Sequence, residues 1–233
     1  MSSVNEILAK LRLESQNVNN LSLSQLHNVL SMLSVKDISI LCEVSGKFNT
    51  FCEEESFWKP KALNDYGIEK KYGNTWKQTV INMDKVNMIN LSDKWIDGKT
   101  YKEILNNTIQ SIADTVLDSQ KRYLLPYGDN DEDATFLQEE VHDEKSIQDF
   151  AIMVFDRNYT DVELNTIFHI KSREINVIYA AVLTYKGGNG YLPGDSNVGL
   201  SSLSYEFLRE MIDPILYVMQ FSSFPDDRLR AVS

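Results

Sequence analysis

The sequence predicts an α+β protein, with an N-terminal three-helix module, extra helices and a C-terminal α+β domain that contains a small antiparallel sheet. Up to about residue 122, apolar residues recur at the i, i+3, i+4, i+7 spacing of amphipathic helices. Beyond residue 150, three short runs are rich in β-branched and aromatic residues, which is typical of strands. The expected parts are an N-terminal amphipathic helix and linker (1–20), the three-helix module (21–60), a helical extension (61–90) and an α+β domain of unknown ligand (91–233).

The N-terminal elements follow from their apolar faces and from the polar segments between them. Residues 4–14 have the pattern of a short amphipathic helix, and the Asn-rich segment 15–22 is typical of a linker. Residues 24–33 place four apolar side chains on one arc, with Ser24 in position to cap the helix. The same pattern predicts four more short helices, at 36–43, 45–53, 55–64 and 74–84.

The second half of the chain changes character after its longest predicted helix, at 99–122. Pro126 and Gly128 end that helical region. Three runs then follow with only short polar links between them, a spacing that predicts an antiparallel meander. A Gly-rich loop (186–199) and one or two closing helices (201–221) complete the domain, with Pro214 as the first residue of the second helix. The three predicted strands are FAIMVFD (150–156), VELNTIFHIKS (162–172) and INVIYAAVLTY (175–185).

The composition limits the classes of function. Of the 233 residues, 42% are hydrophobic and 24% charged, the proportions of a globular protein. No apolar run reaches the roughly 18 residues of a membrane span, and the N-terminus lacks the apolar core of a secretory signal. We therefore expect an intracellular protein of the cytoplasm or nucleus, without membrane contact. A net charge of −11 argues against nucleic-acid binding, because such a surface repels phosphates.

The two cysteines, Cys42 and Cys52, fit the same interpretation. They form neither a disulfide framework nor a C-x-x-C motif. We expect two buried thiols that behave as small apolar groups in a reducing compartment.

The acidic segment 129–140 has the ligand spacing of a calcium-binding EF-hand loop. Four carboxylates fall at positions 1, 3, 5 and 12, but Ala134 occupies position 6, where the sharp turn favours Gly. A solvated acidic loop explains the composition equally well, and we expect no other metal or cofactor. The four candidate calcium ligands are Asp129, Asp131, Asp133 and Glu140.

An enzyme is the least favoured class of function. Its site would lie in the 150–200 region, with Asp156, Asp161 or His169, but no catalytic constellation supports it in the sequence. We therefore expect a protein-binding function without catalysis.

Residues 21–59, LSLSQLHNVLSMLSVKDISILCEVSGKFNTFCEEESFWK, resemble an F-box. The family pattern opens with Leu-Pro, here Leu21 and Ser22, and passes through an apolar helix to a turn with Asp and an apolar residue. A basic residue followed by an aromatic one comes next, here Lys47 and Phe48, and the pattern closes on Phe57 and Trp58. The segment after it, with its Trp76–Lys77 pair, is similar to what often follows an F-box, so the resemblance covers roughly 21–83. Ser22 in place of Pro removes a rigid turn from the loop that contacts the partner in this family.

The resemblance implies a ubiquitin ligase adaptor in the ubiquitin-like (Ubl) conjugation pathway. F-box modules bind the Skp1 adaptor of cullin–RING ligases, and the rest of the chain recruits a target protein, whose identity the sequence does not give. The candidate docking residues for a Skp1-like partner are Leu21, Ser22, Leu23, Leu26, Leu30, Ile38 and Val44. The candidate core residues of the module are Phe48, Phe51, Phe57 and Trp58.

A second hypothesis assigns these helices a structural role. In that case the chain is an assembly protein whose F-box-like helices pack internally or on a sister chain. The abundance of Lys and Asn is typical of AT-rich genomes, and together with the unfamiliar C-terminal half it resembles F-box-like proteins of large DNA viruses. A viral adaptor would redirect the ligase of its host, a host–virus interaction.

Overall fold

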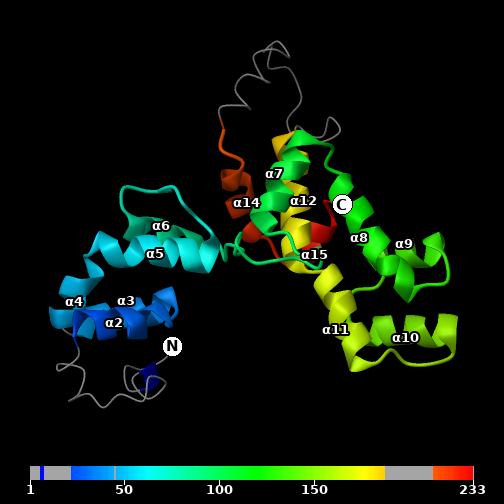
Figure 1. Ribbon diagram of the computed structural model, residues 1–233, viewed down its shortest axis with the longest axis horizontal. Helices are drawn as coiled ribbons and strands as arrows, with labels where there is room; N and C mark the ends of the chain where they lie inside the picture. Colours follow the sequence, from blue (N-terminus) through cyan, green and yellow to red (C-terminus); the bar gives the residue numbers. More distant parts are fainter. Residues whose placement is uncertain (1–5, 8–21, 45, 187–211, 233) are drawn as a thin grey trace, which may run out of the picture. The chain divides into compact units, whose positions relative to one another are not determined.

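The protein is mostly helical and consists of two compact units, residues 1–90 and 91–233 (Figure 1). The computed structural model describes residues 6–7, 22–44, 46–186 and 212–232. It is 69% helical, and its described part contains no strand, only an isolated bridge between Lys94 and Thr100. The predicted α+β class with a small antiparallel sheet is therefore wrong.

The N-terminal unit contains five helices in the described residues from 22 onward. Ser22 caps the first through a capping box with Gln25, and Thr75 caps the last. Gly67 adopts a left-handed conformation with φ 68°, which ends the fourth helix in the way glycine favours. Of the helix predicted at 4–14, only Glu6 and the buried Ile7 are described, and both are helical. The five helices are α2 (Leu23–Ser31), α3 (Val35–Val44), α4 (Gly46–Cys52), α5 (Glu55–Tyr66) and α6 (Trp76–Lys85).

Aromatic side chains from α4 and α5 form much of the interior of this unit. The ring centroids of Phe51 and Phe57 are 4.8 Å apart, and those of Phe57 and Trp58 are 5.0 Å apart. The Trp58 indole donates a 2.7 Å hydrogen bond to the carbonyl of Cys52, so its buried N–H is satisfied. Phe48, the fourth predicted core residue, is also buried.

A disulfide joins Cys42 of α3 to Cys52 of α4, with 6.1 Å between the Cα atoms. The expectation of two separate thiols is therefore wrong for this structure. The ten-residue spacing gives no sign of pairing, because the two residues lie on different helices and only the packing of α4 against α3 brings them together.

The C-terminal unit is built around α12 (Arg173–Tyr185), which contacts α7, α8, α14 and α15 (Figure 1). Seven of the residues of α12 are buried, from Ile175 to Val182. The segment 91–100, which contains Lys94 and Trp95, precedes α7, the first helix of this unit. The other elements are α7 (Tyr101–Gln110), α8 (Thr115–Leu124), the short 3-10 helix η2 (Leu125–Tyr127), α9 (Asp131–Glu139), α10 (Glu144–Phe155), α11 (Asp161–Ile170), α14 (Ile215–Ser222) and α15 (Asp226–Arg230).

The three predicted strands are the helices α10, α11 and α12. The links between them are helix caps rather than hairpin turns: Thr160 and Glu163 form a capping box at the start of α11, and Asp156 ends α10 with φ 52°. α12 is buried around most of its circumference, so its sequence shows a continuous apolar run instead of a helical stripe. Such a run does not distinguish a buried strand from a buried helix.

Two other predictions in this unit are also corrected. The helix predicted at 99–122 is two helices, because the chain breaks at Ser111 between α7 and α8. The acidic segment forms α9 instead of a calcium loop. Asn130 caps this helix, and Asp133 accepts a hydrogen bond from the Asp129 backbone N–H. The Gly-rich loop and most of the helix predicted at 201–221 lie outside the described residues, and Pro214 immediately precedes α14.

Candidate functional site

Three of the seven predicted docking residues of the N-terminal unit lie in its interior. Leu26, Leu30 and Ile38 are each 0% exposed in the isolated chain, so they do not offer a surface to a partner. The physical reason is that α2 and α3 are short, and their apolar faces are needed to form the core of a small unit. Ser22 is exposed and caps α2. Leu21 and the side chains of Leu23 and Val44 lie outside what is described.

The turn between α2 and α3 presents the most exposed large apolar side chain of this unit's described residues. Met32 is 74% exposed, although it lies between residues that are held firmly. The ammonium of Lys61, buried on α5, donates to the carbonyls of Ser31 and Leu33 at 3.3 and 2.8 Å. The same ammonium lies 2.7 Å from the carboxylate of Asp65. The turn is therefore anchored from inside while Met32 points to solvent.

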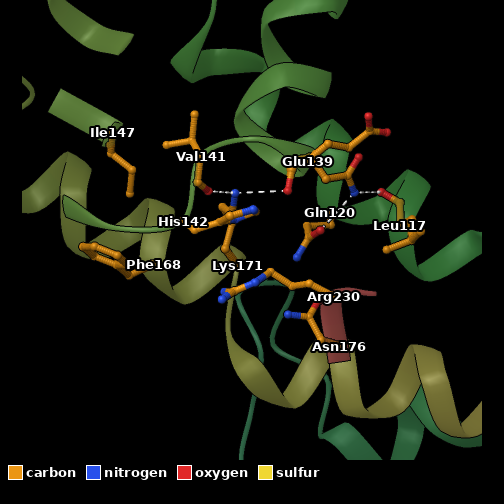
Figure 2. Close-up of a pocket in the computed structure, with 11 residues that line it drawn as sticks. Leu117, Gln120, Glu139, Val141, His142, Ile147, Phe168, Lys171, Asn176 and Arg230 are labelled. Carbon is orange, nitrogen blue, oxygen red and sulfur yellow. Dashed lines mark hydrogen bonds between the residues drawn. The ribbon is translucent and has the colours of Figure 1, made fainter. Parts of the chain in front are cut away.

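A second candidate site is a pocket of about 390 Å³ in the C-terminal unit (Figure 2). It lies among residues of α8, α9, α10, α11, α12 and α15 and of the segment that joins α9 to α10. Its size is within the range of pockets for small organic ligands. The lining residues are Leu117, Gln120, Gln138, Glu139, Val141, His142, Ile147, Phe168, Lys171, Asn176 and Arg230.

Two glutamines hold one wall of the pocket together. The side-chain amide of Gln138 donates to the carbonyl of Leu117 and to the side-chain oxygen of Gln120, both at 2.9 Å. Gln120 in turn donates to the carbonyl of Ile170 at 3.1 Å. These bonds join α8, α9 and α11 along this wall.

Lys171, the residue after α11, places its ammonium at the C-terminal end of α9. It donates to the carbonyls of Leu137, Gln138 and Val141, two of these bonds being drawn in Figure 2. These carbonyls have no helical partner, and the negative end of the helix dipole favours a cation there. Burial lowers the pKa of Lys171 to about 8, and the like charge of Arg230 acts in the same direction.

Two other titratable groups, His142 and Glu139, line the pocket. Burial, Lys171 and Arg230 together lower the pKa of His142. Glu139 is the acidic residue of the lining, and in Figure 2 its carboxylate points away from Lys171 and Arg230. Sequence reasoning missed this site, because its charges come from residues as distant as His142 and Arg230, and none of them belongs to a motif.

The residues of the enzyme hypothesis are not assembled into a site. Asp161 and His169 lie at opposite ends of α11, about 12 Å apart along the helix axis. Asp156 caps the end of α10, and the exposed His169 is 3.4 Å from the carbonyl of Lys94. His169 does not line the pocket, although its neighbour Phe168 does.

The calcium candidates are likewise not brought together. Asp131 pairs with Lys121, and Asp133 binds backbone and side-chain N–H groups at the start of α9. In the described part of the chain, no group of three or more His, Cys, Asp or Glu side chains is placed to hold a metal ion.

Comparisons with known protein families, curated proteins and solved structures find no match to this chain. The F-box resemblance therefore depends on residues 21–83 alone. Among the described helices, none combines the length and apolar character that a membrane span needs.

Proposed function

We propose that the chain is an F-box-type adaptor, in which the N-terminal unit binds a Skp1-like protein and the C-terminal unit recruits a target to a cullin–RING ubiquitin ligase. The observation that carries this proposal is the anchored α2–α3 turn, which presents Met32 at 74% exposure. An apolar side chain held on a rigid turn is suited to act as an interface anchor, because little conformational entropy is lost when it is buried.

The division of the chain supports the same function. Residues 1–90 and 91–233 form separate compact units, an arrangement that suits one docking unit and one recognition unit. The chain would act in the cytoplasm or nucleus, of a host cell if it is viral, and the ligase would supply the catalysis.

The burial of Leu26, Leu30 and Ile38 redefines the docking surface. A docking role for these residues would require the unit to open, so the proposed contact is the surface around Met32 instead. Their burial also favours the rival hypothesis, a structural or assembly protein whose F-box-like helices pack internally. A binding experiment separates the two.

The test is the affinity of the full chain for purified Skp1, measured by isothermal titration calorimetry. Cytosolic thiols are kept reduced, so the titration is run with dithiothreitol and repeated without it. We expect a Kd in the micromolar range or tighter. Met32→Glu should weaken binding at least tenfold, because it buries an unpaired charge at the contact.

The matched control is Val162→Glu in the C-terminal unit. Val162 is 75% exposed, so both substitutions place one carboxylate at an equally exposed apolar position. Val162→Glu should leave Skp1 binding unchanged. If the wild-type chain shows no binding at micromolar concentrations under either redox condition, the adaptor function is excluded and the assembly role stands.

A further inference from the structure

The disulfide of the N-terminal unit lies beside another pocket of that unit, of about 510 Å³. Cys42 lines this pocket and is half-buried, whereas Cys52 is 0% exposed. The two residues joined by one S–S bond therefore differ in their access from outside. We propose that Cys42–Cys52 is a reversible redox site, which a small thiol such as glutathione opens by attacking the sulfur of Cys42, and that its opening loosens α4.

Access, rather than charge, distinguishes the two sulfurs. Thiol–disulfide exchange begins when a thiolate attacks one sulfur, and its rate depends on access to that sulfur. The size of the pocket is within the range that holds small organic molecules. In its described lining, the cation is Lys77, which pairs with Glu53 at 2.6 Å, and the carboxylate is Glu43. This lining offers an approaching thiolate room, but no excess of positive charge.

The exchange consists of two balanced steps. The thiolate of the small thiol forms a new S–S bond to Cys42 while the bond to Cys52 breaks, so Cys52 leaves as a thiolate and takes up a proton. A second thiolate then attacks the small thiol's sulfur in this mixed disulfide, and Cys42 leaves as a thiolate and is also protonated. The protein gains two electrons and two protons, and two small thiols become one disulfide. Oxidised glutathione reverses both steps.

α4 is the element that the disulfide constrains. It has seven residues, the fewest of the helices α2 to α6, and a helix of this length needs tertiary contacts to form. Besides the disulfide, these contacts are the buried rings of Phe48 and Phe51 and the hydrogen bond from the Trp58 indole to the Cys52 carbonyl. They remain after reduction, so we expect the reduced unit to stay folded. The chain between the two cysteines regains conformational freedom, so α4 should open more often.

The first measurement compares two variants of the full chain that each keep one cysteine. Cys52→Ser leaves the thiol of Cys42, and Cys42→Ser leaves the thiol of Cys52. The chain contains two cysteines, so alkylation by iodoacetamide, followed by mass spectrometry, reports a single thiol in each variant. We expect Cys42 to react about tenfold faster, because Cys52 is covered. Equal rates in variants with unchanged circular dichroism spectra would overturn Cys42 as the point of attack.

A second measurement needs no substitution, so it stays decisive if either variant fails to fold. The wild-type chain is oxidised with oxidised glutathione, incubated without denaturant in reduced glutathione, quenched with acid and mapped by peptide mass spectrometry. We expect the mixed disulfide on Cys42, and two free thiols per chain after excess dithiothreitol. A mixed disulfide on Cys52, a bond that opens only in denaturant, or a bond that does not form would each overturn the redox site.

Hydrogen exchange measures the consequence for α4. In the reduced chain we expect the amides of α4 to exchange about tenfold faster than in the oxidised chain, while those of α12 in the C-terminal unit stay unchanged. Unchanged exchange in α4 would show that the bond has no conformational effect. Faster exchange throughout α2 to α6 would show that the bond maintains the fold instead of acting as a switch. None of these measurements involves Skp1, so their outcome is independent of the adaptor function.

Discussion

The two units contain the same structural device, a buried lysine, but its charge is balanced by a carboxylate in one unit and not in the other. In each, a buried lysine donates to carbonyls at the C-terminal end of a neighbouring helix: Lys61 at the end of α2, and Lys171 at the end of α9. Lys61 is 2.7 Å from the carboxylate of Asp65. Lys171 instead faces Arg230, and its pKa is lowered to about 8.

The difference separates a lysine that serves the fold from one that also marks a site. The charge of Lys61 is balanced within α5, so nothing further is needed to stabilise it. The charge of Lys171 is balanced only by carbonyl dipoles, and a cavity lies beside it. A fold tolerates such an unbalanced charge at a cost in stability, and perturbed lysines of this kind are concentrated at functional sites.

The largest effect should come from Lys61→Met. This change leaves the carbonyls of Ser31 and Leu33 without their donor and leaves Asp65 without its cation. We expect a loss of about 3 kcal/mol in the unfolding free energy of the N-terminal unit. Urea unfolding of the full chain, followed by tryptophan fluorescence, measures it. The control is Lys59→Met at an exposed position of the same helix, and an equal loss in both variants would show that Lys61 has no special role.

Lys171→Met should have a smaller effect, about 1.5 kcal/mol. The variant loses three hydrogen bonds to carbonyls, but it also removes a desolvated charge that Arg230 repels. The two effects partly cancel, which is not the case for Lys61. Urea unfolding of the C-terminal unit tests this, and a loss larger than that of Lys61→Met would reverse the comparison.

The sequence predicts α2 and α6 well because each has a regular apolar stripe and a capping side chain, although the cap of α2 is Ser22 and not Ser24 as predicted. The helix predicted at 24–33 is α2, displaced by one or two residues, and 74–84 corresponds to α6. What the stripe cannot reveal is what covers it. Leu26, Leu30 and Ile38 have the same pattern whether they face a partner or the interior of their own unit, and here they face the interior.

The C-terminal helices were mispredicted although the sequence contained a signal. Thr160 and Glu163 have the Thr-x-x-Glu spacing of a capping box, which marks the start of a helix. The adjacent alanines Ala180 and Ala181 also favour a helix over a strand. β-branched neighbours outweighed both signals in the prediction. The pocket had no comparable signal, because it depends on how α9, α11 and α15 pack together.

The smallest effect is a pH dependence that Lys171 should give to the C-terminal unit. Its pKa in the folded chain, about 8, lies below the ordinary value of about 10.4, so between these values the unfolded chain binds more protons. The unfavourable contribution of the charged lysine is thus fully present below pH 8 and is relieved as the pH rises.

From pH 7 to pH 9 we therefore expect the unfolding free energy to rise by up to about 1 kcal/mol relative to Lys171→Met. The lowered pKa of His142, which also lines the pocket, keeps this residue neutral throughout the window. Burial raises the pKa of Tyr101 to about 12, which places its ionisation above the window. Urea unfolding of both proteins at four pH values measures the difference. If the difference in unfolding free energy between the two proteins did not change with pH, the carbonyls of α9 alone would balance the charge of Lys171, as Asp65 does for Lys61. The contrast between the two units would then disappear.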